Sequence, residues 1–171
     1  MNHLQFTLNE LEVPGVLLEE ALRVLVNSIL LTRQTASVGL TQVTSECGIS
    51  YITFKDPELK EDVELKVKLF ANLLKSKHRA IVSLTFEEGA SCQAWEQWNC
   101  PLRIGDTEQL REGLRSSILE IIQNVCSHST HIPFRKTEIQ GKFPFSLSYS
   151  EVDEQFDDLR RSASTIKSIN C

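Results

Sequence analysis

The sequence lacks the clustered glycines that cradle phosphates in nucleotide-binding proteins. Its 171 residues include only seven glycines, and these are scattered along the chain. None stands with a second glycine in an expected strand-to-helix turn. Binding of a nucleotide through such a loop is therefore not expected.

Long hydrophobic runs and an excess of basic residues are also missing. The longest apolar stretch, residues 24–31, is broken by Asn27 and Ser28 and is shorter than the roughly 18 residues that cross a membrane. Acidic residues outnumber basic ones, 23 to 18, so the net charge is -5 and no broad cationic surface is expected. We therefore expect a cytoplasmic protein with no transmembrane segment and no nucleic acid as its main partner.

Cysteine usage gives no sign of a disulfide framework. The five cysteines form no C-x-x-C pair and occur without a glycosylation sequon or a recognisable signal peptide, which favours a reducing compartment. Cys126, His128 and His131 form a compact group of metal-type ligands, but a structural zinc site would need one more. We predict no metal, no cofactor and no catalytic residue. A small zinc or thiol enzyme is the least favoured hypothesis.

Hydrophobic content and periodicity predict one domain over residues 1–171. With 41% hydrophobic residues, a chain of this length can bury one ordinary core. Alternation in residues 4–8 predicts a strand, and helical spacing in residues 16–34 predicts a helix that is buried nearly all round. A loop with room for a short strand is expected over residues 35–48, followed by a strand over residues 49–54.

The middle of the chain predicts a second helix and a β-hairpin. Asp56 should cap a helix that begins at Pro57 and runs to about Lys77. Alternating residues 80–86, a turn signal and a further stretch that ends at Ile104 predict the hairpin.

A third helix is expected next, with an apolar stripe wider than core packing requires. Asp106 and Gln109 resemble a capping box at its start. The stripe consists of Leu110, Leu114, Ile118, Ile121 and Val125, widened by Leu119 and Ile122. This width is compatible with packing on another chain, although a broad core-facing stripe is the commoner cause.

The residues after Pro133 predict an edge strand and then a helical extension. Alternation resumes near Phe143, and Pro144 favours the edge of a sheet. Residues 150–171 begin acidic and end basic, which suits the helix dipole. Their narrow apolar stripe consists of Val152, Phe156, Leu159, Ala163 and Ile166. This helix could dock on its own domain or on a partner.

Both tryptophans, Trp95 and Trp98, lie near the start of the second hairpin strand. Side chains alternate along a strand, so residues three apart should point to opposite faces. One indole is expected to enter the core and the other to find a partner. The pair is therefore a possible recruitment surface.

Several short segments follow one another in the order of the predicted elements. They are Leu11-Glu12-Val13, Glu19-Glu20-Ala21, Ile29-Leu30-Leu31-Thr32-Arg33, Tyr51-Ile52-Thr53-Phe54, Trp95-Glu96-Gln97-Trp98 and His131-Ile132-Pro133. Their order and spacing resemble the autophagy-related protein 101 branch of the HORMA-domain family. The resemblance implies an α+β fold: a HORMA (Mad2-like) domain in which a mainly antiparallel sheet packs against three helices, with an open-type C-terminal region.

The resemblance also implies a function. Members are non-catalytic scaffold subunits of the autophagy-initiation kinase complex, act at the phagophore assembly site, and pair with and stabilise the HORMA domain of autophagy-related protein 13. The third helix lies near the centre of that heterodimer. Carried onto this chain, the expected partner-binding residues are Arg111, Leu114, Arg115, Ile118, Leu119 and Ile122.

The chain departs from the family pattern in the hairpin loop. Animal members carry a protruding Trp-Pro-Phe finger there that recruits downstream factors, whereas residues 88–93 of this chain contain no aromatic side chain. Recruitment through a finger is therefore not implied. The alternative hypothesis is a peptide-capturing Mad2-type HORMA adaptor of another pathway. The short chain after Pro133 argues against it, because little remains to cross the sheet as a belt.

Overall fold

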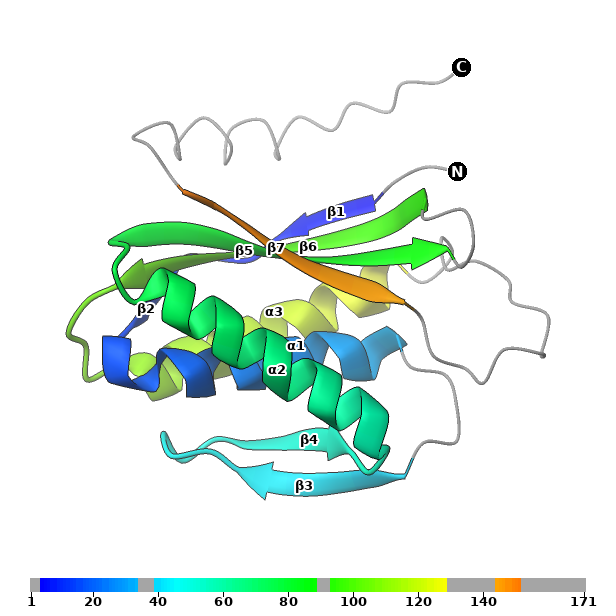
Figure 1. The fold of residues 1–171 in the computed structure, drawn as a ribbon, viewed down its shortest axis with the longest axis horizontal. Coiled ribbons are helices and arrows are strands. Elements are labelled where there is room, and N and C mark those ends of the chain that lie inside the picture. Colours follow the sequence, from blue (N-terminus) through cyan, green and yellow to red (C-terminus); the bar gives the residue numbers. More distant parts are fainter. Residues whose placement is uncertain (1–3, 34–38, 89–92, 129–143, 152–171) are drawn as a thin grey trace, which may run out of the picture.

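A sheet and a group of helices form separate layers in the computed structural model of the chain (Figure 1). The structure describes residues 4–33, 39–88, 93–128 and 144–151. The strands are β1 (Leu4–Thr7), β2 (Leu11–Val13), β3 (Leu40–Thr44), β4 (Ser50–Phe54), β5 (Arg79–Glu88), β6 (Gln93–Ile104) and β7 (Phe145–Glu151). The helices are the short 3-10 helix η1 (Gly15–Leu17), α1 (Leu18–Arg33), α2 (Pro57–Leu74) and α3 (Leu110–Ser127).

The five-stranded sheet is mixed in direction. Its order is β1-β6-β5-β7, with β2 also paired to β6, while β3 and β4 form a separate two-stranded sheet. β5 runs antiparallel to β6 and β7, but β1 and β2 run parallel to β6. The prediction of a mainly antiparallel sheet therefore holds for the three longest strands. The short N-terminal strands β1 and β2 add parallel pairings to β6, because the chain between them and β6 is long enough for a crossover connection.

α1 is the central helix, as its all-round apolar pattern predicts. It packs against α2, α3 and β4, and Figure 1 shows the large sheet lying across the helices on the side opposite β3 and β4. Asn27 interrupts the apolar run, yet its side chain is satisfied inside the core. Its Nδ2 donates to the Arg23 carbonyl at 2.8 Å, and its Oδ1 accepts from Thr53 Oγ1 at 3.1 Å. Among the described residues, no helix is long and apolar enough to cross a bilayer.

The two outer helices begin differently. The Asp56 carboxylate accepts a hydrogen bond from the Leu59 amide at 3.0 Å, which confirms the predicted cap of α2. The predicted capping box at Asp106 is wrong. α3 begins at Leu110, its N-cap position is held by Gln109 without a side-chain cap, and Thr107 Oγ1 accepts from the Gln109 amide at 3.0 Å. Because a turn at Thr107 precedes α3, the helix starts only at Leu110. Asp106 therefore lies too far upstream to cap the first backbone amides of α3.

A β-bulge changes where the tryptophans point. Phe86 pairs with Glu96 and Glu87 pairs with Ala94, so Trp95 is the extra residue in β6. A bulge breaks strict alternation, and both Trp95 and Trp98 join one core with exposed fractions of 1% and 0%. The prediction of opposite faces is therefore wrong. Neither indole offers solvent-facing surface, so a direct recruitment surface formed by this pair is not supported.

The last described strand confirms the edge position expected from Pro144. β7 follows that proline and pairs with β5 at the end of the sheet. Ser150 and Glu151, predicted to open the helical extension, belong to β7, and the rest of that extension lies outside the described residues. β5 is thus paired on both sides within this chain, which leaves it no free edge for the added strand of a captured peptide.

Candidate functional site

α3 is seated on the domain through a closely packed inner face. Its fully buried side chains are Leu110, Leu114, Ser117 and Ile121. Gly113 permits a close approach to β2, because a Cβ at this position would lie 2.5 Å from Leu11 Cδ1. Leu114 is therefore a core residue in this structure, and its expected contact with a partner is corrected: the side chain packs inward and has no exposed surface.

A polar contact fixes the rotation of α3 about its axis. The Glu120 carboxylate accepts hydrogen bonds from the Asn9 backbone amide at 3.0 Å and from Asn9 Nδ2 at 3.2 Å. This contact ties α3 to the link between β1 and β2. Burial, reinforced by the negative charge of Glu120, raises the pKa of the nearby Cys100 thiol in β6 to about 12.

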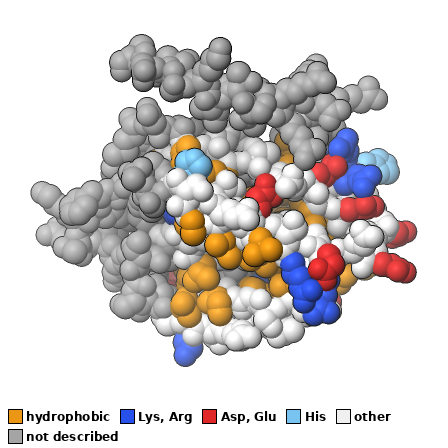
Figure 2. Space-filling view, turned by 180° about the vertical axis from the view of Figure 1, so that it is seen from behind, with side chains coloured by type: hydrophobic (Ala, Val, Ile, Leu, Met, Phe, Trp, Pro, Cys, Tyr) orange, Lys and Arg blue, Asp and Glu red, His pale blue; other side chains and the backbone are white. Residues whose placement is uncertain are grey.

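The opposite side of α3 presents apolar side chains to solvent. Leu119 is 59% exposed, Ile122 is also exposed, and Ile118 at the rim is half-buried against the core. Figure 2 views the molecule from behind, where α3 lies, and shows hydrophobic side chains gathered on that face. Residues 118, 119 and 122 fall close together on a helix of 3.6 residues per turn, so they form one surface.

The first half of the same surface is basic. Arg111 and Arg115 are both exposed, and Arg115 Nη1 lies 2.8 Å from Glu112 Oε1. Arg111 extends toward the turn between β3 and β4, since a Cβ at Gly48 would lie 3.8 Å from its Cζ. We call Arg111, Arg115, Ile118, Leu119 and Ile122 the outer face of α3. It can bind an apolar surface bordered by acidic groups.

A buried ion pair lies beneath the tryptophans and was not anticipated from the sequence. Glu96 accepts from Arg33 Nε at 2.8 and 3.0 Å and from Trp98 Nε1 at 2.5 Å. Arg33 ends α1, so the pair fastens the central helix to β6. Buried charges require such partners. The available signal was a glutamate flanked by two tryptophans, which a simple strand pattern does not explain.

The metal-type group at the end of α3 is only partly described. Cys126 and His128 are exposed, and His131 lies outside the described residues. Within the described ranges, no three His, Cys, Asp or Glu side chains come together in a way that could hold a metal ion. The hairpin loop over residues 89–92, for which a finger was not expected, is likewise outside the described part of the chain.

The comparison with known families agrees with the fold and with the order of its elements. The family model described as autophagy-related protein 101 matches residues 10–138. This range contains every described element from β2 to α3 and leaves out β1 and β7. No curated protein matches the chain. The family has the HORMA fold and consists of non-catalytic adaptors. The chain belongs to the autophagy-related protein 101 family and has a role in the autophagy-initiation complex.

Proposed function

We propose that the outer face of α3 binds the HORMA domain of autophagy-related protein 13. The chain then serves as a scaffold that stabilises this partner within the autophagy-initiation kinase complex, in the cytoplasm and at the phagophore assembly site. Family membership supports a role in the complex. The exposed side chains of α3 support the position of the interface.

The observation that carries this proposal is a pair of large aliphatic side chains, Leu119 and Ile122, exposed on a helix whose other side is packed. Full burial of each would contribute about 1.5–3 kcal/mol. A stable interface buries roughly 1,200–2,000 Å² and usually centres on such anchors, with charged residues at its rim. Arg111 and Arg115 lie where a rim would be and would orient the partner and speed association.

Substitution of Leu119 by aspartate tests the interface. We expect Leu119→Asp to weaken binding of the purified partner HORMA domain by at least about 30-fold, because a charge would be buried at the centre of the contact. Isothermal titration calorimetry measures this loss. Leu119 is exposed in the isolated chain, so the substitution should leave the fold intact, as circular dichroism can verify.

Leu69→Asp is the matched control for this experiment. Leu69 is 55% exposed, close to the value for Leu119, but lies on α2 at the other side of α1. Its affinity for the partner should equal that of the unchanged chain. If Leu119→Asp binds the partner with unchanged affinity, or if both variants lose the same affinity, the interface does not lie on α3. Ile118→Asp is a weaker probe, because Ile118 also packs against the core.

A further inference from the structure

The two-stranded sheet has a free edge along β3. β4 packs against α1 and α2, whereas β3 pairs with β4 alone among the described strands and lies outermost in Figure 1. Most of its side chains are exposed, namely Leu40, Gln42, Val43 and Thr44. β3 is therefore an edge strand that faces solvent.

The hydrogen bonds to β4 show which backbone groups of β3 point to the free edge. The Lys55 amide donates to the Gly39 carbonyl at 2.7 Å, and the Ser45 amide donates to the Ile49 carbonyl at 2.8 Å. Hydrogen-bonded pairs recur at every second residue of an antiparallel ladder, so the odd-numbered residues of β3 face β4. The even-numbered residues therefore direct their N–H and C=O groups to the free edge. They are Leu40, Gln42 and Thr44.

β3 has none of the features that usually prevent an edge strand from pairing. Charged side chains, prolines and β-bulges are the common ones. The strand reads Leu-Thr-Gln-Val-Thr, and its register with β4 is continuous. Threonine and valine, which are β-branched, also favour a strand. The edge can therefore accept a further strand.

We propose that β3 pairs with β3 of a second copy of this chain, antiparallel and about a two-fold axis at Gln42. In this register, Leu40 lies opposite Thr44 of the second copy, and Gln42 lies opposite its own equivalent. Every outward-facing residue then belongs to a hydrogen-bonded pair, which exchanges two backbone hydrogen bonds. The same surface is used by both copies, so the assembly closes as a dimer.

The exposed apolar side chains of β3 gain neighbours in this register. Leu40, which is 48% exposed, meets Thr44 of the second copy on the outer face of the sheet. Val43, which is 38% exposed, meets Thr41 of the second copy on the face that Thr53 turns toward α1. Side chains directly opposite one another on paired strands stabilise the pairing.

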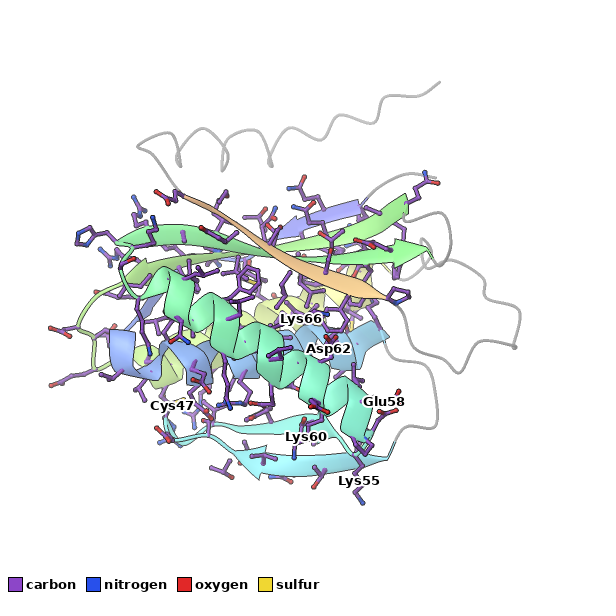
Figure 3. The ribbon with its side chains drawn as sticks, in the orientation of Figure 1. Cys47, Lys55, Glu58, Lys60, Asp62 and Lys66 are labelled. Carbon is purple, nitrogen blue, oxygen red and sulfur yellow. The ribbon has the colours of Figure 1, made fainter. Side chains whose placement is uncertain are left out.

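Charge complementarity supports a second copy as the occupant. Lys55 lies beside the start of β3, since a Cβ at Gly39 would be 3.0 Å from its Cδ. Glu46 is exposed in the turn after β3, next to Cys47, and Figure 3 shows Cys47 and Lys55 at opposite ends of the small sheet. Antiparallel pairing places Gly39 opposite Ser45 of the second copy. Lys55 of each copy therefore comes close to Glu46 of the other, and the opposite charges attract.

The short length of β3 predicts a weak dimer. A pairing of five residues from each copy buries less than the roughly 1,200 Å² of a standard interface. We expect a dissociation constant on the order of 100 µM. Such an association responds to local concentration, so it would join copies that are already gathered at one place.

Sedimentation velocity of the full chain, from roughly 10 to 500 µM, tests the proposal around the expected dissociation constant. We expect Gln42→Lys to weaken the dimer at least about tenfold, because two like charges would face each other across the axis. Ser50→Lys is the matched control. It adds the same charge to the same face of the hairpin, but on β4 and away from the second copy, so the dimer should persist.

Exchange of the two charges tests the register. Glu46→Lys and Lys55→Glu should each weaken the dimer about fivefold, because each reverses both contacts between the copies. The double variant should recover the original affinity, since the opposite charges meet again. Both side chains are exposed, so the fold should be retained, as circular dichroism can verify.

Every other outcome overturns the proposal. A monomer over the whole range would leave the edge of β3 to a different occupant, such as an extended segment of another protein. A dimer that Gln42→Lys leaves unchanged, or that Leu119→Asp abolishes, would form through another surface. If Gln42→Lys fails to fold, the charge exchange decides, and no recovery in the double variant rejects the pairing. No partner HORMA domain is present, so the result does not bear on its binding to α3.

Discussion

Among single residues, the cysteines differ most clearly in chemical reactivity. Cys100 is buried in the core, and burial together with the charge of Glu120 raises the pKa of its thiol to about 12. Cys126 is exposed on α3, and Cys47 is intermediate, with its Sγ 3.0 Å from Ser45 Oγ. The thiolate is the reactive form of cysteine. In the folded protein, Cys126 is therefore accessible to thiol reagents and Cys100 is not.

This difference predicts the labelling pattern of the native protein. In brief alkylation at pH 8, Cys126 should be labelled and Cys100 should not, as peptide mapping by mass spectrometry can show. Cys100 should stay unlabelled at pH 9 as well, since a buried thiol with a pKa of about 12 is still almost wholly protonated there. Both should be labelled after unfolding in urea. Native labelling of Cys100 at the rate of Cys126 would mean that the core around β6 opens.

Among the elements, the two outer helices are fixed in different ways, α2 by a local cap and α3 by tertiary packing. α2 has a proline in its first turn and a carboxylate cap from Asp56. α3 has no side-chain cap. It is held instead by the close approach of Gly113 to Leu11 and by the bonds from Asn9 to Glu120. The start of α2 is therefore specified locally, whereas α3 depends on its neighbours.

The difference between the two helix starts predicts losses of stability of different size for the same type of substitution. Asp56→Ala should lower the free energy of unfolding by about 1 kcal/mol, because the Leu59 amide loses its acceptor. Asp106→Ala is the matched control. It should change stability by less than about 0.5 kcal/mol, because Asp106 is exposed and caps nothing. Urea unfolding measures both values. Equal losses would restore Asp106 as a cap and contradict the observed start of α3.

In the whole molecule, the two exposed apolar faces lie on opposite flanks of α1. One is the outer face of α3, the other consists of Leu65, Leu69 and Leu73 on α2, and α1 contacts both helices. Each face can be changed without the other, which is why Leu69→Asp serves as the control for Leu119→Asp.

Binding of a partner through α3 should also stabilise the whole chain. A ligand that binds only the folded state, at 100 times its dissociation constant, raises the free energy of unfolding by about 2.7 kcal/mol. We expect this gain from the HORMA domain of autophagy-related protein 13, measured as a shift in thermal unfolding. Leu69→Asp should keep the gain and Leu119→Asp should lose it. A full gain in Leu119→Asp would show that the partner binds elsewhere.

The sequence by itself determined the features that depend on near neighbours in the chain. Helical spacing located all three helices, and alternation located the hairpin strands. A carboxylate before Pro57 was enough to predict the start of α2, because a cap acts within one turn. The family could also be recognised, since short segments in a fixed order persist where the fold does.

Only the tertiary structure decided which side of each element is used. The β-bulge in β6 directs the Trp95 side chain into the core, and no local sequence pattern predicts this bulge. Arg33 and Glu96 meet although they are 63 residues apart. Leu114 and Leu119 looked equivalent in one wide stripe, yet one is buried and the other exposed. Periodicity gives the angle between two side chains on a helix, but the neighbouring elements fix how the helix is rotated against the core.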